Sequence, residues 1–267
     1  MSNLPFADKK LGQHFLRDQR VIDQIVTDHA LNAKFILEVG PGPGILTKFL
    51  CMHKKPIQVL EKDSRMVEYL REFLSGDQML ITDALEVDLN SYLMQLTWDE
   101  DVWLVSNLPY NVGVPLLINF IQAIPVRYMT LMFQKEVGEK VLDISGCKNS
   151  MGSLMALTQN YFDVKFKCPV MPDAFVPPPK VDSVVISLKR KEIPEIPLSE
   201  FRSYEKFLRK LFAHKRKQVG SVLKNNYEKE EMEAAFEKVG LDRTKRAEFF
   251  TLSQVQDLYK LLTQGSI

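Results

Sequence analysis

The sequence predicts an α/β fold with a mostly parallel, seven-stranded sheet, followed by a small all-α domain at the C-terminal end. Short apolar runs typical of buried strands alternate with stretches of helical spacing. A glycine-rich loop at residues 40–44 joins the first such run to a helix, as in nucleotide-binding βαβ units. Beyond residue 198 only helical spacing is present, which predicts the separate helical domain.

Length and composition are those of an ordinary globular protein. The 267 residues are 45% hydrophobic and 26% charged, with a net charge of +1, which argues against a wholly basic nucleic-acid coat. We expect neither a membrane span nor a signal peptide, because no apolar run is long enough and residues 1–5 lack the pattern. Cys51, Cys147 and Cys168 are far apart, so we expect no disulfide framework, no metal site and a cytoplasmic location.

Seven strands and six helices are expected in the first part of the chain. The strands form a mostly parallel sheet covered by helices on both faces, and the last two form a hairpin at one edge. The expected strands are residues 35–39, 57–60, 79–82, 102–106, 128–133, 161–170 and 181–188. The expected helices are residues 21–30, 45–50, 64–74, 114–123, 135–143 and 153–159.

The helical part begins after a proline-containing linker at residues 192–197, so the domains are expected at 1–192 and 198–267. Its helices are expected at residues 198–213, 216–226, 229–239 and 253–262, with Gly240 as a helix stop. Residues 199–227 contain eight Lys or Arg against two Glu, a local net charge of +6. Such a cluster is either a solvated helix face or an RNA phosphate contact. The residues we assign to RNA are Arg209, Lys210, Lys215, Arg216 and Lys217.

The glycine loop contains Gly40, Gly42 and Gly44 with two prolines between them. It lacks the third glycine of the dinucleotide fingerprint, and no Gly-Lys-Ser/Thr is present to hold a triphosphate. A loop of this kind fits a ligand without a pyrophosphate, such as S-adenosylmethionine. Backbone can approach a ligand closely at glycine, which has no Cβ.

Acidic residues follow the next two strands. Glu61 ends the second strand, where a carboxylate can accept both hydroxyls of a ribose. The alternative is a solvated turn. The position favours the ribose role for Glu61, and the residues that follow, Asp63 or Ser64, are expected to cap the next helix. Asp83 and Ala84 follow the third strand, and the Asp83 carboxylate could accept the adenine amino group of the same cofactor.

Asn107, Leu108, Pro109 and Tyr110 follow the fourth strand, at the carboxyl edge where open α/β sheets bind ligands. Amide and carbonyl oxygens there can accept the hydrogens of an exocyclic amine, and the Tyr110 ring can stack on a base. The alternative is an ordinary turn. Phe175, beside a triple proline, is either a core residue or a second stacking ring. Among the polar residues of the N-terminal arm, Gln13 and His14 are candidates for a pocket wall, although a packing role is the more common one for such a histidine.

These motifs together resemble the ribosomal RNA adenine dimethyltransferase family, nearest to the bacterial members related to kasugamycin sensitivity. The resemblance covers essentially the whole chain. It depends on the segments Leu11–Leu16, Glu38–Gly44, Asn107–Tyr110, Gln134–Val137, Phe175–Ser183 and Phe212–Leu223.

The resemblance implies a Rossmann-like S-adenosylmethionine-dependent methyltransferase fold with a helical RNA-binding domain. It implies dimethylation at N6 of two adjacent adenosines in a hairpin loop near the 3′ end of small-subunit ribosomal RNA. The immature small subunit is then the partner, and we expect a monomer. The family's cofactor contacts fall on His14, Leu16, Gly40, Glu61, Asp83 and Asn107.

The chain departs from the family pattern at two positions. His14 stands where many members have Asn, and both side chains can form hydrogen bonds. Gly138 stands where a small residue such as Ala is common, a difference expected to cost little.

Two alternatives remain open. A large-subunit RNA adenine methyltransferase shares the glycine loop and Asn107–Tyr110, but the 177–183 run and the basic tail favour the small-subunit target. A non-catalytic RNA-binding factor on the same fold is the second alternative. The intact Asn107–Tyr110 motif, together with Glu61 and Asp83, argues against it.

Overall fold

The computed structural model describes residues 4–8, 11–142, 151–214 and 216–264. The chain separates into two compact units, Met1–Gly138 with Val164–Arg190, and Glu139–Asp163 with Lys191–Ile267. The second unit therefore includes residues 139–163 as well as the C-terminal helices. The expected domain limits of 1–192 and 198–267 stay a prediction.

The first unit contains the predicted seven-stranded sheet, in the order β4-β3-β2-β5-β6-β9-β7. The five strands β4, β3, β2, β5 and β6 pair in parallel, and β9 runs antiparallel to β6. The last two predicted strands are neighbours at one edge, as expected. The strands are β2 (Phe35–Val39), β3 (Ile57–Glu61), β4 (Met79–Ile81), β5 (Val102–Asn107), β6 (Val126–Gln134), β7 (Phe162–Val170) and β9 (Ser183–Arg190).

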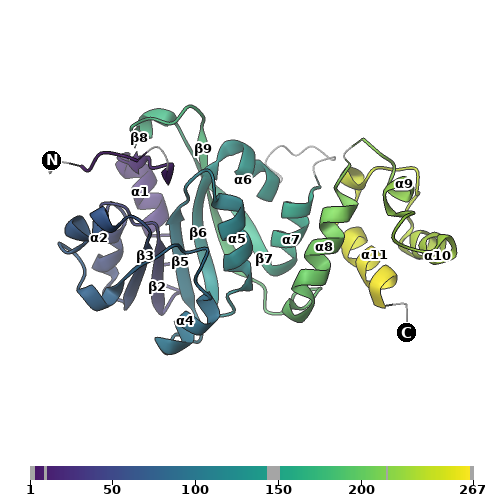
Figure 1. Ribbon diagram of the computed structural model, residues 1–267, viewed down its shortest axis with the longest axis horizontal. Helices are drawn as coiled ribbons and strands as arrows, with labels where there is room; N and C mark the ends of the chain where they lie inside the picture. The colour runs from purple at the N-terminus through teal and green to yellow at the C-terminus, as the bar shows by residue number, and fades with distance from the viewer. Residues whose placement is uncertain (1–3, 9–10, 143–150, 215, 265–267) are drawn as a thin grey trace. The chain divides into compact units, whose positions relative to one another are not determined.

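Helices cover both faces of this sheet, with α1 and α2 on one face and α5 on the other (Figure 1). Their bounds are α1 (Gln19–Val26), α2 (Thr47–Leu50), α3 (Val67–Leu70), α4 (Leu89–Gln95), α5 (Gly113–Gln122) and α6 (Lys135–Val141). Helix α1 starts earlier than predicted, because the Asp18 carboxylate accepts from the Arg20 N–H and caps it there, and it ends earlier, at Val26. Helix α4 was not predicted, although Asp88 caps it in the same way.

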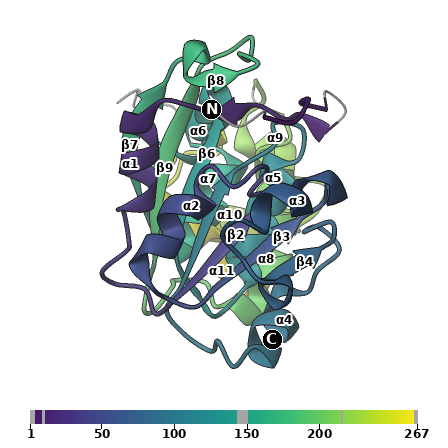
Figure 2. The ribbon, with the colours of Figure 1, turned by 90° about the vertical axis from the view of Figure 1, so that its left-hand side faces the viewer.

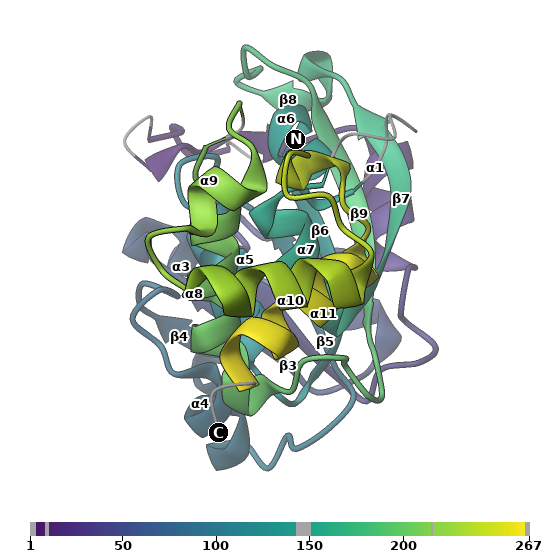
Figure 3. The same ribbon diagram turned by 90° about the vertical axis from the view of Figure 1, so that its right-hand side faces the viewer.

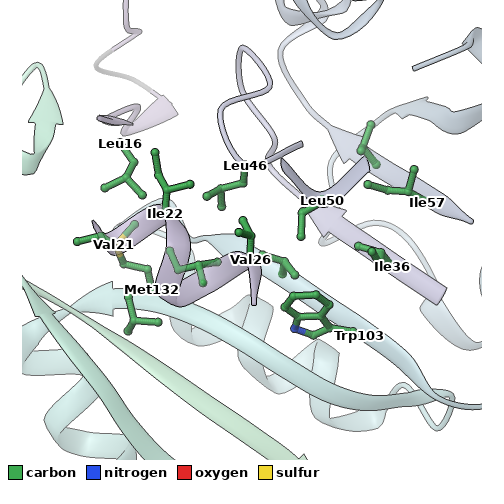
Figure 4. Close-up of a cluster of buried hydrophobic side chains, with 14 of the residues drawn as sticks. Leu16, Val21, Ile22, Val26, Ile36, Leu46, Leu50, Ile57, Trp103 and Met132 are labelled. Carbon is green, nitrogen blue, oxygen red and sulfur yellow. The ribbon is translucent and has the colours of Figure 1, made fainter. Parts of the chain in front are cut away.

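The core between α1, α2 and the sheet is apolar (Figure 4). Trp103 and Val105 of β5 belong to it, so Leu104 between them points to the opposite face. Full burial of each large apolar side chain contributes about 1.5–3 kcal/mol. The labelled members in Figure 4 are Leu16, Val21, Ile22, Val26, Ile36, Leu46, Leu50, Ile57, Trp103 and Met132.

The N-terminal arm contains a short strand that the sequence pattern did not predict. β1 (Phe15–Leu16) pairs antiparallel with β8 (Phe175–Val176), and the Arg17 N–H donates to the Ala174 carbonyl at 2.7 Å. Figure 2 shows the arm and β8 above the strands of the large sheet. Two segments about 160 residues apart in the chain are thus held side by side.

The second unit is helical in its C-terminal part, as predicted. It contains α7 (Ser153–Tyr161), α8 (Phe201–Leu211), α9 (Val219–Leu223), α10 (Lys229–Val239) and α11 (Leu252–Gln264). Helix α10 lies beside α11 (Figure 3) and ends at Gly240, whose φ of 68° fits the predicted helix stop. The predicted linker is held by Asn160, whose side chain bonds both the N–H and the carbonyl of Ile196.

The predicted helix at residues 216–226 is wrong at its start. Arg216 and Lys217 lie in a turn, where the Lys217 N–H donates to the His214 carbonyl, and α9 begins only at Val219. Among the described residues, no helix has the length and apolarity to cross a membrane.

Candidate cofactor and adenine site

A cavity of about 190 Å³ lies in the first unit, at the carboxyl ends of its parallel strands. The N-terminal arm, the glycine loop, the ends of β3 and β4 and the loop after β5 line it. It brings together most residues that the sequence assigned to the cofactor and the adenine. Those that line it are Gln13, His14, Leu16, Gly40, Gly42, Glu61, Asp83, Ala84, Asn107, Leu108, Pro109 and Tyr110.

Glu61 and Asp83 face this cavity as carboxylates held by fixed donors. The Glu61 oxygens accept from the backbone N–H groups of Gly42 at 2.9 Å and Asp63 at 2.7 Å. Burial raises the pKa of Glu61, and these two bonds oppose the shift. The hydrogen bond from Lys62 at 2.6 Å lowers the pKa of Asp83, so Asp83 stays an ionised acceptor at neutral pH.

The three glycines of the loop have different roles. Gly40, with φ of 70°, lines the cavity, and no heavy atom lies within 4 Å of where its Cβ would be. Gly42 also lines the cavity and donates to Glu61. Gly44 does not line it. A Cβ at Gly44 would lie 2.9 Å from the Phe73 ring, so this glycine allows close packing behind the loop.

The side-chain amide of Asn107 is oriented by the N-terminal arm. Its Nδ2 donates to the backbone carbonyl of His14 at 3.1 Å. Because a carbonyl can only accept, the NH2 group must face His14, and Oδ1 is left as an acceptor beside the cavity. One residue earlier on the same strand, β5, the Ser106 hydroxyl donates to the carbonyl of Val39 at 2.6 Å, which ties the end of β5 to the end of β2, where the glycine loop begins.

Three rings meet next to Asn107. The His14 imidazole stacks on Tyr110 with ring centres 5.4 Å apart, and it meets Phe175 edge-on at 6.5 Å. His14 Nδ1 donates to the Pro177 carbonyl at 2.8 Å, and the Tyr110 hydroxyl bonds Ser183 Oγ at 2.7 Å. Residues 175–183 therefore hold the His14 and Tyr110 rings in place through these two hydrogen bonds.

Phe175 is 1% exposed and belongs to the hydrophobic core. Of the two interpretations that the sequence left open, core packing is the one observed in this conformation. Stacking of Phe175 on a target base would require its exposure, and it stays a prediction.

Gln13 connects the arm to the end of β3. Its Nε2 donates to Asp63 at 2.9 Å and its Oε1 accepts from the Asp8 N–H. Asp63 also caps the 3₁₀ turn η3 (Ser64–Met66) ahead of α3, as the sequence suggested. Gln13 thus acts on the cavity by fixing the arm.

Glu38 is a cavity residue that the sequence analysis did not assign. It is 1% exposed, lines the cavity and accepts a hydrogen bond from Thr47 at 2.7 Å. Burial raises the pKa of Glu38 to about 8. The sequence feature that could have identified Glu38 is its charge, because it is the one charged residue in the otherwise apolar strand β2.

The predicted RNA-binding residues lie in the second unit, except that Lys215 lies outside the described residues. Arg216 and Lys217 are exposed in the turn before α9, whereas Arg209 forms an ion pair with Glu205 at 2.6 Å. Lys210 is half-buried at the end of α8.

A second basic segment, at residues 243–246, was missed. The N–H groups of Val219 and Gly220 donate to the carbonyls of Lys245 at 2.8 Å and Arg243 at 3.0 Å. This pairing joins the segment to the start of α9, immediately after the basic turn.

The profile of the ribosomal RNA adenine dimethylase family matches residues 6–264. The chain belongs to this family. It is therefore an S-adenosylmethionine-dependent ribosomal RNA adenine dimethyltransferase, as the resemblance implied. Two bacterial relatives named "Ribosomal RNA small subunit methyltransferase A" are similar over 92% of the chain. The one from Clostridium botulinum (strain ATCC 19397 / Type A) is 34% identical over 90% of its own length, and the one from Clostridium perfringens (strain SM101 / Type A) is 35% identical over 87%.

Two solved structures share the fold. The 23S rRNA methyltransferase ErmE superposes with a TM-score of 0.68 at 26% identity, covering 93% of this chain and 99% of that one. A dimethyladenosine transferase from Plasmodium falciparum superposes with a TM-score of 0.71 at 24% identity, covering 92% of this chain and 96% of that one. The predicted methyltransferase fold is confirmed.

The residues that line the dimethylase cavity fit S-adenosylmethionine by their chemistry. Gly40 leaves room that a Cβ would fill, and Asp83, Glu61 and Asn107 follow the neighbouring strands β4, β3 and β5 on either side of β2. Among the described residues, no three His, Cys, Asp or Glu lie together as a metal site would require.

Proposed function

We propose that this chain dimethylates N6 of two adjacent adenosines in a hairpin loop near the 3′ end of small-subunit ribosomal RNA. The names of its bacterial relatives support the small subunit as the target. The observation on which the chemistry depends is the orientation of Asn107, whose amide donates to His14 and presents its oxygen beside the cavity.

An aromatic amine is a poor nucleophile because its lone pair is delocalised into the ring. In this proposal Asn107 Oδ1 and the carbonyl of Leu108 or Pro109 would accept the two N6 hydrogens, which turns the lone pair out of the ring system. Positioning of this kind can remove roughly 7–11 kcal/mol of the barrier. When bound, S-adenosylmethionine supplies a methyl group on a positively charged sulfur.

The strand ends would hold the cofactor in the order of the sheet. Asp83 accepts the adenine amino group, Glu61 accepts the ribose hydroxyls, and the glycine loop lies against the amino-acid end. His14 and Leu16 of the N-terminal arm line one side of the cavity. The hydrogen bond from Gln13 to Asp63 fixes the arm in this position.

The target adenine must leave its stack at a cost of a few kcal/mol. Stacking on the Tyr110 ring offsets about 1–3 kcal/mol of this. One face of that ring is covered by His14, so the base uses the other face or displaces the imidazole.

RNA phosphates would contact the second unit through Lys210, Lys215, Arg216 and Lys217. We add the segment 243–246, which is hydrogen-bonded to the start of α9; within it Lys245 contributes most, because Arg243 and Arg246 are ion-paired with Glu233 and Glu248. Arg209 contributes less to phosphate binding, because its charge is already paired with that of Glu205. We also propose that the enzyme acts as a monomer in the cytoplasm, on immature small subunits.

The test is methyl transfer from labelled S-adenosylmethionine to small subunits that lack the modification, with the methylated bases mapped by primer extension. We expect two adjacent dimethylated adenines near the 3′ end. Large-subunit RNA is tested in parallel, because the likeness to ErmE favours it as the second candidate target. Modification of large-subunit RNA alone would overturn the proposal.

A further inference from the structure

The pairing of the large sheet stops earlier between β2 and β5 than on either side of them. The β2–β5 register ends at Glu38 and Val105, whereas β2 stays paired with β3 as far as Val39 and β5 with β6 as far as Asn107. The strand order also reverses here, since β3 and β4 lie to one side and β6 to the other. Open α/β sheets bind their ligands at such a point.

A buried serine bridges the two strands where their pairing has ended. The Ser106 hydroxyl donates to the Val39 carbonyl at 2.6 Å, and among the described residues this is the one side-chain hydrogen bond between β2 and β5. Ser106 is 2% exposed and Val39 is 3% exposed, so little water is at hand to replace a lost bond. Val39 lines the cavity, whereas Ser106 does not.

Each side of this bridge is anchored to its own outer strand. The Gly40 N–H donates to the Leu60 carbonyl at 2.8 Å, which fixes the start of the glycine loop to β3. The Leu108 N–H donates to the Met132 carbonyl at 3.2 Å, which fixes the loop after β5 to β6. The proposed cofactor ligands and the proposed adenine ligands are thus held by opposite halves of the sheet, and the serine hydroxyl joins the halves.

We propose that Ser106 is a positioning residue that sets the separation between the methyl group of the cofactor and the N6 amine of the target adenine. Its hydroxyl holds the start of the glycine loop and the backbone of Asn107 at one distance, without touching either ligand. The inference deepens the proposed function and rests on the role proposed there for Asn107.

A change in this separation should act on the rate more than on affinity. Transfer requires the attacking nitrogen and the methyl carbon to approach to about 3–3.5 Å, and an error of about 1 Å can slow a reaction about 100-fold. Glu61 and Asp83 lie at the ends of β3 and β4, away from the bridge, so cofactor binding should be nearly unchanged. The bond from Asn107 to His14 remains, which limits the displacement.

Ser106→Ala in the full chain tests this. The rate is measured as single-turnover transfer from labelled S-adenosylmethionine to small subunits that lack the modification, and the cofactor dissociation constant is measured by calorimetry. We expect transfer to slow about 10- to 100-fold, with little change in the dissociation constant. An unchanged rate, or a loss of cofactor affinity as large as the loss of rate, would overturn the inference.

The matched control is Ser187→Ala on β9. Ser187 is 7% exposed, its hydroxyl bonds His29 Nε2 at 2.9 Å, and it does not line the cavity. The substitution removes the same group from the same sheet, so denaturant unfolding should show a comparable loss of stability while the rate is kept. Equal losses of rate in the two variants would assign the effect to a weakened sheet and overturn the inference.

A double-mutant cycle tests whether Ser106 acts through its neighbour. If it positions Asn107, then Ser106→Ala should slow transfer by a clearly smaller factor in the Asn107→Ala background than in the unmodified protein. The same factor in both backgrounds would overturn the positioning role. If Ser106→Ala does not fold, Ser106→Cys keeps the size with a weaker donor and should also slow transfer, and an unchanged rate there has the same meaning.

The outcomes separate this inference from the proposed function. Transfer by the unmodified protein, together with an equal rate in Ser106→Ala, would overturn the inference alone. No transfer by the unmodified protein to small subunits would overturn the proposed function and the inference with it.

Discussion

Replacement of Asn107 with alanine should slow methyl transfer about 100- to 1,000-fold, or about 2.7–4 kcal/mol, the cost of losing one preorganised polar group at a reacting centre. The acceptor acts more strongly in the transition state, because the attacking amine becomes positively charged. Cofactor affinity should change less than tenfold, since Glu61 and Asp83 remain.

The fold should survive this substitution. Asn107 contributes one part-buried hydrogen bond, to His14 at 3.1 Å. The net contribution of such a bond is about 0.5–1.5 kcal/mol. For a chain of this size that corresponds to a fall of a few degrees, roughly 1–6 °C, in Tm.

The assay is single-turnover transfer to unmethylated small subunits with enzyme in excess, with cofactor binding measured separately by calorimetry. Asn32→Ala is the control, because it removes the same amide from an exposed position that does not line the cavity. It should leave the rate within a few-fold. Equal losses of rate and of cofactor affinity in Asn107→Ala would refute the assigned role.

Three other changes have separate readouts. Gly138→Ala should destabilise the protein by about 1–3 kcal/mol in denaturant unfolding, because its Cβ would lie 2.1 Å from the buried Val184 Cγ2. Arg216→Gln with Lys217→Gln should weaken RNA binding and lower the slope of log affinity against log salt by about one unit per lost phosphate contact. Tyr110→Phe keeps the ring but loses the bond to Ser183, so it should lower kcat less than Tyr110→Ala, which also loses about 1–3 kcal/mol of base stacking.

Each of these has its own contradicting result. Adding Val184→Ala to Gly138→Ala should recover stability, and no recovery would show that the steric reason is incorrect. Lys238→Gln on α10 is the control for the basic turn, and an equal loss of salt dependence there would point to a general charge effect. Equal kcat values for the two Tyr110 variants would argue against stacking.

The Gly138 position has a packing reason that the sequence alone does not contain. From the sequence alone, a glycine in place of alanine was expected to cost little. The structure packs α6 against Val184 of β9 so closely that alanine would be the costly residue. The local pattern of α6 contains no information about a side chain 46 positions away.

The sequence by itself determined where the chemistry lies along the chain. The side-chain period of buried strands and the glycine loop specified a parallel sheet, and parallel strands end at one edge. Glu61, Asp83 and Asn107 follow such strands, so their meeting at one cavity could be predicted. The helical second part was predicted for a similar reason, because amphipathic spacing is local.

Only the tertiary structure decided how the neighbouring groups are used. His14 binds Pro177 across 163 positions, Phe175 is buried, and Gly44 packs on Phe73 and not on the cavity. The acidity of Glu38 likewise depends on burial between two strands and on the nearness of Glu61. These properties depend on side chains from distant segments that meet only in the folded chain, and no spacing within one segment encodes them.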